Sequence, residues 1–495
     1  MSHLLGIDLG TTGARALVVT AGDGRVVASA GAEFPLHAPR PRWAEQDPED
    51  WWRAAVAAAR AALATARAAG PVEVAGIGLS GQMHGVVLLD DAGAVVHPAL
   101  LWSDGRTDAE CRAITETVGA ERLLDLVGNP ALTGFSAPKL LWLRAHAPDA
   151  FARARTFLLP KDYLRYRLTG SYASEVSDAS GTLLFDVARR RWSDDVLAAL
   201  RLDRALLPDV HESTAVTGHL LATVADELEL APGTPVVGGG GDQAAGAVGA
   251  GVVRPGMVSA TIGSSGVVFA QVERPARDAR VHGFCHAVPG AWHIMGVTQA
   301  AGLSLRWLRE QIAPGDSYEA LVREAEEAPP GSDGLVFAPY LMGERTPHLD
   351  PHARGVFFGL TYTHRRAHLV RAVMEGVAYS LRDCLDVMTG LGLSVAEIRA
   401  AGGGAKSPLW RQILADVLEA EIATLDVTEG PAHGAALLAG VGTGAWSSVA
   451  EATGAALRVT SRVAPDRARA AVYRDGHATY RELYARLSPL FPRAA

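Results

Sequence analysis

The chain contains 495 residues, carries a formal net charge of −8, and 20% of its residues are charged. A chain of this length is too long to fold around one hydrophobic core, and it predicts two large lobes or about three domains. The mild negative charge argues against a nucleic-acid-binding protein, which usually presents a basic face. The sequence shows no apolar stretch free of charge that is long enough for a membrane span.

The number and spacing of the cysteines indicate the cellular compartment of the protein. Cys111, Cys285 and Cys384 lie far apart and form no CxxC pair, as is typical of free thiols in a reducing environment. Asp8 interrupts the first apolar run, which argues against a signal peptide. We therefore expect a soluble, cytoplasmic α/β protein.

The chain is expected to begin with a β-hairpin. Residues 4–9 and 14–20 are apolar strands, and Gly10-Thr11-Thr12-Gly13 forms the turn between them. Hydroxyls and backbone N–H groups at such a tip suit phosphate oxygens, and Asp8 beside it suits Mg²⁺. The alternative is an ordinary hairpin with a Thr-rich turn, which these residues taken alone favour.

A polar loop follows the next predicted strand. A helix is expected to begin at residues 47–50, because Asp and Pro are favoured at the start of a helix. Residues 74–79 are expected to form a strand. The strand ends in Ser80-Gly81-Gln82-Met83-His84-Gly85, before a further strand at 86–89. Such loops hold ligands in α/β folds, so Gln82 and His84 are expected to bind hydroxyls and Met83 to pack on a carbon skeleton.

Residues 102–106 combine an aromatic ring, an acid and a cation, which is common in sugar sites. Trp102 and Asp104 are the candidate contacts, and the alternative is that Asp104 caps a helix at 107–118. Helices are expected to dominate as far as about residue 170. The next expectations are a mixed, mainly extended stretch over 173–186, and helices with connections over 195–230.

The centre of the chain carries one acid among small residues. A strand ends at Val237, and Gly238-Gly239-Gly240-Gly241 precedes Asp242. A carboxylate in such an apolar setting is costly unless a partner or metal requires it. The pattern therefore indicates either a catalytic Asp242 or a helix N-cap.

The pattern of the first hairpin returns after residue 250. Strands are expected at 257–262 and 267–272, with Gly263-Ser264-Ser265-Gly266 between them. This weak repeat suggests a duplicated fold with two phosphate-holding hairpins. Gly402-Gly403-Gly404-Ala405-Lys406-Ser407 follows another strand and precedes a helix at 408–418, a geometry suited to nucleotides. Further strands are expected at 281–286 and 292–296, further helices at 303–311, 365–389 and 431–442, and a helical tail beyond about 450.

The order of these motifs resembles the FGGY family of carbohydrate kinases, over roughly residues 3–443. The segments that carry the resemblance are Asp8–Gly13, Gly81–Gly85, Gly241–Gln243, Gly263–Gly266 and Gly402–Ala405, with support from Leu100–Arg106, Leu159–Leu164, Ser177–Thr182 and Pro339–His348. Glycerol kinases of this family are expected to have an Arg-Glu pair where this chain has Met83 and His84. That departure argues against glycerol as substrate.

The resemblance implies an α/β fold of two actin-like, RNase H-like lobes, with mixed central sheets and an active-site cleft between the lobes. The expected domains are residues 1–250, an N-terminal lobe with the sugar site and phosphate hairpin; residues 251–443, a nucleotide-binding C-terminal lobe; and residues 444–495, a helical extension of the second lobe.

It also implies ATP-dependent phosphorylation of a ketose, foremost D-xylulose to D-xylulose 5-phosphate. Asp242 is then the general base, Asp8 is a second catalytic acid, and both bind Mg²⁺. The expected sugar contacts are Gln82, Met83, His84, Trp102, Asp104, Asp242 and Gln243. Gln243 stands where many members have Asn, one methylene shorter. The expected nucleotide contacts are Thr11, Thr12, Gly13, Gly263, Ser264, Gly302, Gly403, Gly404, Ala405 and Ser407.

Three other interpretations stay open. The first is another FGGY kinase, acting on ribulose, another pentulose or a polyol. The second is an actin-like ATPase that binds a protein partner, which would not require residues 81–85 or Asp242. The third is a sugar sensor without kinase activity, which the presence of both Asp8 and Asp242 disfavours. A homodimer is compatible with the resemblance, while neither nucleic acid nor membrane is expected as a partner.

Overall fold

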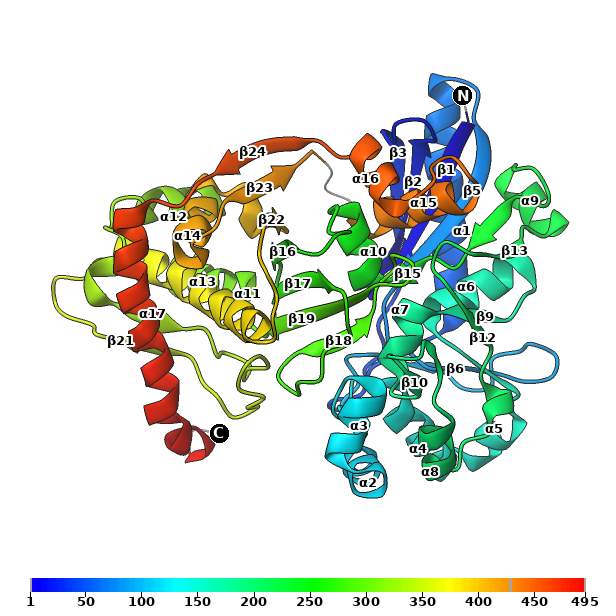
Figure 1. Ribbon diagram of the computed structural model, residues 1–495, viewed down its shortest axis with the longest axis horizontal. Helices are drawn as coiled ribbons and strands as arrows, with labels where there is room; N and C mark the ends of the chain where they lie inside the picture. The colour runs from blue at the N-terminus through cyan, green and yellow to red at the C-terminus, as the bar shows by residue number, and fades with distance from the viewer. Residues whose placement is uncertain (1, 427–429, 494–495) are drawn as a thin grey trace.

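The computed structural model describes residues 2–426 and 430–493. Two lobes lie side by side, each built on a mixed β-sheet with helices on its faces (Figure 1). This arrangement confirms the expected α/β class with two lobes. Within the described residues, no helix combines the length and apolar character that a membrane crossing requires.

Residues 2–249 of the first lobe form fifteen strands and ten α-helices. The strands are β1 (Ser2–Leu9), β2 (Gly13–Thr20), β3 (Val26–Glu33), β4 (Glu45–Gln46), β5 (Glu73–Gly81), β6 (Val87–Leu89), β7 (Ala99–Leu100), β8 (Thr156–Leu158), β9 (Ala173–Glu175), β10 (Phe185–Asp186), β11 (Arg191–Trp192), β12 (Asp209–His211), β13 (Val216–His219), β14 (Pro235–Val237) and β15 (Gly240–Gly241). The helices are α1 (Pro48–Ala69), α2 (Asp108–Val118), α3 (Ala120–Val127), α4 (Ser136–His146), α5 (Pro148–Arg153), α6 (Pro160–Thr169), α7 (Val176–Ala179), α8 (Asp194–Leu200), α9 (Ala222–Leu228) and α10 (Asp242–Gly249).

The remaining elements follow residue 256. The strands are β16 (Met257–Ile262), β17 (Gly266–Val272), β18 (His282–Cys285), β19 (Trp292–Thr298), β20 (Val336–Ala338), β21 (Val356–Phe358), β22 (Glu397–Ala401), β23 (Ile422–Leu425) and β24 (Val459–Val463). The helices are α11 (Gly302–Gln311), α12 (Tyr318–Ala325), α13 (Arg366–Gly390), α14 (Pro408–Leu418), α15 (Gly430–Gly442), α16 (Val449–Ala456) and α17 (Arg467–Leu487).

The two central sheets share one topology. The first runs β13-β14-β5-β1-β2-β3, and the second runs β24-β23-β22-β16-β17-β19, with β18 outside β19. In each sheet the first strand of the repeat pairs antiparallel with the next strand and parallel with a later one: β1 with β2 and β5, β16 with β17 and β22. The duplicated fold suggested by the two Gly-hydroxyl turns is therefore confirmed.

Helices cover both faces of the first sheet. The expected helix at 47–50 is α1, in which the Asp47 carboxylate accepts a hydrogen bond from the Glu49 backbone N–H at 2.9 Å. Its buried stripe, which includes Trp51, packs against β2 and β3. The opposite face is covered by α15, which lies against β1, β5 and α10.

Helix α15 shows that the chain returns to the first lobe, which differs from the expected domain limits. A Cβ on Gly6 of β1 would lie 2.0 Å from the Ala432 carbonyl oxygen, and one on Gly78 of β5 would lie 1.9 Å from that of Ala435. The glycines therefore permit a backbone-to-backbone approach. Residues 430–442, expected in the second lobe, lie on the first sheet, and α16 packs beside α15 (Figure 1).

Beyond α16 the chain again joins the second lobe, where β24 pairs with β23 and α17 packs on α13 and α14. The expectation of an all-helical tail missed β24. Polar residues fill the strand between its terminal valines, and it is largely exposed, as suits an edge strand, without apolar alternation. Residues 173–186 are not extended throughout, because the Glu175 carboxylate accepts hydrogen bonds from the Ser177 and Asp178 backbone N–H groups and begins α7. The strands β12 and β13 were likewise missed within 195–230.

Hydrogen bonds tie the lobes together where β18 and β19 meet the first lobe. The Asn129 side chain donates to the Gly283 carbonyl at 2.9 Å, and the Cys285 N–H donates to the Ser180 hydroxyl at 3.0 Å. A buried apolar cluster that includes Phe135 and Phe284 crosses the same junction. The lobes are thus joined on one side of the cleft described below.

Candidate active site

Two carboxylates meet at the ends of parallel strands in the first lobe. Asp8 on β1 pairs with Ser80 on β5, and Gly241 on β15 pairs with Gly81 on the same strand. Asp242 follows directly as the first residue of α10. Carboxyl ends of parallel strands are where open α/β sheets bind ligands. The structure therefore brings together the two acids that the sequence singled out.

The electrostatics of Asp242 suit a base that works near neutral pH. Burial and, to a smaller extent, the charge of Asp8 raise the pKa of Asp242 to about 7, against hydrogen bonds from Gln243 that oppose the rise. The N-cap of α10 is Gly241, so the alternative of Asp242 as a capping residue is wrong. A carboxylate that accepts a proton at neutral pH has the property required of a general base.

The loop after β5 lies against Asp242. The Gln82 N–H donates to the Leu9 carbonyl at 2.7 Å, which fixes the loop on β1. A Cβ on Gly241 would lie 2.8 Å from Cγ of Met83, so the Met83 side chain rests on the residue before Asp242. Gln82 is 2% exposed and its amide donates to Gln46 at 3.2 Å. Its side chain thus supports the loop.

His84 is held in one orientation and one tautomer. Its backbone is left-handed, with φ of 70°, and its Nδ1–H donates to the Gly181 carbonyl at 2.6 Å. The ring lies edge-on to Phe135, with centroids 4.7 Å apart. Burial lowers the pKa of His84 to about 3. The imidazole is therefore neutral at pH 7, and its Nε2 lone pair is available to a hydroxyl group.

Trp102 and Asp104 have different surroundings. Trp102 is 40% exposed, and its indole N–H donates to the Thr11 hydroxyl at 3.0 Å, next to the first hairpin tip. Asp104 is 1% exposed, and its carboxylate accepts from the Ala44 N–H at 2.7 Å and pairs with Arg106 at 2.6 Å. A direct sugar contact by Asp104 is therefore corrected to a role in holding this loop. Nor does Asp104 cap α2, whose N-cap is Thr107.

The first hairpin tip has the tight geometry expected for a phosphate loop. The Gly10 N–H donates to the Gly13 carbonyl at 2.9 Å, and the Thr11 carbonyl accepts from Gln46 at 2.7 Å. Thr12 is exposed at the tip. Because Gln46 also bonds Gln82, one amide connects the hairpin with the loop that carries His84.

A pocket of about 750 Å³ in the second lobe collects most of the expected nucleotide contacts. Its wall includes Gly263, Ser264, Gly302, Gly403, Gly404 and Ser407. The sequence missed the other wall, formed by side chains of α11 and α12 that include Arg306, Tyr318 and Arg323. Helix α12 was not foreseen, and its residues carry no glycine motif that would have marked them.

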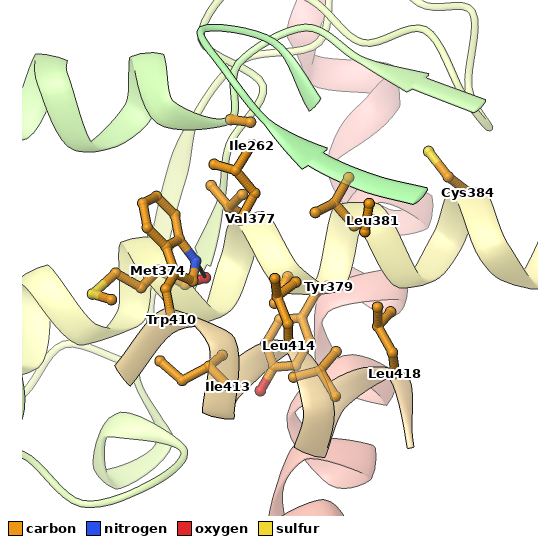
Figure 2. Packing of buried hydrophobic residues seen from close by; sticks show 14 of the residues in the cluster. Ile262, Met374, Val377, Tyr379, Leu381, Cys384, Trp410, Ile413, Leu414 and Leu418 are labelled. Atoms are coloured by element: carbon orange, nitrogen blue, oxygen red, sulfur yellow. Dashed lines mark hydrogen bonds between the residues drawn. The ribbon is translucent and has the colours of Figure 1, made fainter. Parts of the chain in front are cut away.

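The floor of this pocket rests on a packed apolar core. Figure 2 shows Trp410 of α14 packed beside Met374 of α13, with Ile262 at the end of β16 above them. The Trp410 indole N–H donates to the Met374 carbonyl at 3.0 Å, and the Ser407 hydroxyl accepts from the Trp410 backbone N–H at 3.1 Å. A Cβ on Gly404 would lie 2.5 Å from Cγ2 of Ile262, so the glycine loop lies directly on this core.

A cavity of about 720 Å³ opens between the lobes and adjoins the nucleotide pocket. Asp242 and Gln243 of α10 line one side, and Ala405 lies on the side formed by the second lobe. Gly403 and Lys406 line both hollows. The expected cleft between the lobes is therefore present, with Asp242 in its wall and the nucleotide pocket next to it.

A buried ionic cluster, to which no sequence motif assigned a role, lies behind Asp242. Lys161 pairs with Asp162 at 2.7 Å, with Asp178 at 3.4 Å and with Glu175 at 3.5 Å, and all four side chains are 0% exposed. Ser177 donates to Glu175 and accepts from the Gly241 N–H at 3.1 Å. The cluster thus holds the residue that precedes Asp242. This role becomes visible only in the structure, where residues 161–178 lie next to Gly241.

Comparisons with known proteins agree with this geometry. The N-terminal domain of the FGGY family of carbohydrate kinases matches residues 3–249, and the C-terminal domain matches residues 258–443. The xylulose kinase of Escherichia coli (strain K12) is 42% identical over 491 residues, covering 98% of this chain and 99% of that protein. The xylulose kinase of Bacillus subtilis (strain 168) is 38% identical over 492 residues, covering 99% of this chain and 98% of that protein.

Solved structures extend the similarity to the whole fold. The crystal structure of xylulose kinase from Rhodospirillum rubrum has a TM-score of 0.93 and 34% identity, and the similarity covers 99% of each chain. A xylulose kinase from Brucella ovis has a TM-score of 0.92 and 37% identity. From its sequence and its fold, this chain belongs to the FGGY family of carbohydrate kinases.

Proposed function

We propose that this protein transfers the γ-phosphoryl group of ATP to the 5-hydroxyl of D-xylulose, giving D-xylulose 5-phosphate and ADP. The observation that carries the proposal is the position of Asp242, in the wall of a cleft between the lobes and beside the glycine loops of the nucleotide pocket. The xylulose kinases compared above resemble the chain over nearly its full length.

Asp242 acts as the base in this proposal. Its carboxylate takes the proton of the sugar hydroxyl as the oxygen bonds to phosphorus and the bond to ADP breaks. Phosphoryl transfer depends mainly on positioning and charge stabilisation, and a base of suitable pKa adds about 10²–10⁴ in rate. The pKa near 7 of Asp242 supports this role.

The sugar site is proposed to form around Met83, His84, Trp102 and Gln243. Neutral His84 accepts a hydroxyl hydrogen bond at Nε2, because Nδ1–H is already bonded to Gly181. Met83 contributes an apolar surface beside Gly241. The hairpin residues Thr11, Thr12 and Gly13 would approach the transferred phosphate from the first lobe.

Mg²⁺ fits the donor set around Asp8 and Asp242. Two carboxylates near one another repel, as the effect of Asp8 on Asp242 shows, and a divalent cation relieves that repulsion. Mg²⁺ typically uses one or two carboxylates together with substrate phosphates. When bound, it would neutralise charge on the phosphates of ATP.

The proposal places the enzyme in the cytoplasm, in agreement with its three unpaired, buried cysteines. A homodimer remains a prediction. The competing assignments are another FGGY kinase with a different pentulose or polyol, an ATPase that binds a protein, and a sugar sensor.

The test is ADP release from ATP and Mg²⁺ with D-xylulose, D-ribulose, L-ribulose, glycerol and gluconate, each supplied separately. Strong stimulation by D-xylulose alone is the expected result. Stimulation by another sugar would keep the kinase and change its substrate. Sugar-independent turnover would favour the partner-binding ATPase, and sugar binding without turnover would favour the sensor.

A further inference from the structure

The four glycines before Asp242 have no side chains that could hold the loop in place. Glycine has the greatest conformational freedom of all residues, and Gly239 adopts a left-handed backbone with φ of 71°. A Cβ on Gly239 would lie 1.9 Å from the Leu79 carbonyl oxygen of β5, so a side chain has no room here. The position of Asp242 therefore depends on hydrogen bonds to the backbone groups of residues 238–241.

The buried ionic cluster supplies such hydrogen bonds at both ends of the loop. The Arg165 guanidinium, paired with Asp162 at 3.0 Å, donates to the Gly238 carbonyl at 2.6 Å. At the other end, the Gly241 N–H donates to the Ser177 hydroxyl at 3.1 Å. Arg165, Asp162 and Ser177 are each 0% exposed, so bulk water does not compete for these bonds.

Glu175 fixes the direction in which the Ser177 hydroxyl acts. The hydroxyl donates its single proton to the Glu175 carboxylate at 2.8 Å, which leaves its lone pairs for the Gly241 N–H. The same carboxylate accepts from the Ser177 backbone N–H and from the Ser213 hydroxyl, each at 2.8 Å, and lies 3.5 Å from Lys161. Hydrogen bonds to a charged acceptor are stronger than neutral ones, so the hydroxyl is held as an acceptor for Gly241.

Gly241 passes any shift of this bond directly to the proposed base. It is the N-cap of α10, and Asp242 is the first residue of that helix. Without the Ser177 hydroxyl, the buried Gly241 N–H loses its acceptor, which is costly, and the loop is expected to shift. A misplacement of about 1 Å can cost about a hundredfold in rate, because the base must meet the sugar hydroxyl in a narrow geometry.

We propose that Ser177 is a positioning residue for phosphoryl transfer: its hydroxyl, oriented by Glu175, holds the Gly241 N–H and so places the Asp242 carboxylate against the sugar hydroxyl. This inference rests on the proposed function. It assigns to Ser177 an effect on the rate of transfer and not on substrate affinity, because the described walls of the cleft and of the nucleotide pocket do not include Ser177.

Ser177→Ala and Ser213→Ala form a matched pair that tests this role. Both serines are 0% exposed and donate to Glu175 at 2.8 Å, but the Gly241 N–H donates to Ser177. The rate of a single turnover, measured with enzyme in excess over ATP and with saturating D-xylulose, excludes any masking by product release. Ser177→Ala should lower this rate roughly ten- to a hundredfold and change the KM values for D-xylulose and ATP by less than about threefold. Ser213→Ala should change the rate by less than about threefold, although both variants should lower the midpoint of thermal unfolding by similar amounts.

A double-mutant cycle then shows whether Ser177 acts through Asp242. The Asp242→Asn background has already lost the base. In this background, Ser177→Ala should lower the residual turnover by less than about threefold, because residues that act as a unit are not additive. A residue that only stabilises the fold would lower the rate by the same factor in both backgrounds.

Three results would overturn the inference while wild-type turnover with D-xylulose sustains the kinase assignment. They are full additivity in the cycle, equal rate losses for the two serine variants, and an unchanged rate for Ser177→Ala. Absence of wild-type turnover with D-xylulose would refute the proposed function itself. If Ser177→Ala does not fold, Ser177→Cys supplies the same comparison, because a thiol is a weak donor and acceptor, and it should show a smaller loss in the same direction.

Discussion

Replacing Gly181 with alanine tests whether the position of His84 controls sugar binding. A Cβ on Gly181 would lie 2.6 Å from Nδ1 of His84 and 2.7 Å from its Cε1, where ordinary contacts begin at 3.4 Å. The imidazole must therefore move by about 0.8 Å, a typical overpacking change that costs about 1–3 kcal/mol. The same movement weakens the bond from Nδ1–H to the Gly181 carbonyl, which contributes about 0.5–1.5 kcal/mol.

We expect Gly181→Ala to raise the KM for sugar roughly tenfold, since about 1.4 kcal/mol of binding is a factor of ten. The KM for ATP should stay nearly constant, because the nucleotide pocket lies in the other lobe. Steady-state kinetics with each substrate varied in turn, together with a thermal unfolding curve, measures both effects. An unchanged sugar KM, or a selective loss of ATP affinity, would refute the placement of His84 in the sugar site.

Two further predictions concern the base and the helix behind it. The kcat/KM for sugar should fall as the pH drops below about 7, because the raised pKa of Asp242 leaves more of this carboxylate protonated, and a higher Mg²⁺ concentration should move the inflection to lower pH. Profiles of kcat/KM against pH at two Mg²⁺ concentrations measure both effects. A profile that is flat from pH 5 to 8 would contradict the requirement for an ionised Asp242. Gly434→Ala should destabilise the fold by about 3 kcal/mol or more and lower kcat, because its Cβ would lie 1.9 Å from the Ala245 carbonyl of α10. Gly454→Ala in α16 is the control, because a Cβ at this position meets open space, and it should raise the free energy of unfolding in urea by about 0.5–1 kcal/mol. Equal stabilities of the two variants would contradict the close approach of α15 to α10.

Local signals account for the parts of the fold and site that the sequence could predict. A few neighbouring residues are enough to identify each of three features: the hairpin tips, the glycine loop at 402–404 and the isolated Asp242. Their grouping follows from the duplicated topology, because β1 and β16 end in comparable positions of their sheets. His84 was identified by its loop between glycines, and the structure adds its tautomer and its neutral charge.

Long-range packing accounts for the rest. The sequence does not show that the Asp104 carboxylate is used by the backbone of Ala44, sixty residues away, in addition to its near neighbour Arg106. The return of α15 to the first sheet depends on Gly6 and Gly78, which are unremarkable within their strands. The sequence likewise does not show that Lys161 pairs with Glu175 and Asp178 as well as with its neighbour Asp162, because those two acids lie more than ten residues away.

The central claim is that Asp242 is the base, and Asp242→Asn tests it most directly. Asn keeps the shape of the side chain and cannot accept the proton. Turnover with D-xylulose and saturating ATP should fall by about 10² or more, while calorimetric binding of both substrates persists. A variant that keeps more than about a tenth of wild-type turnover would contradict the claim, because a lost base should cost at least that factor.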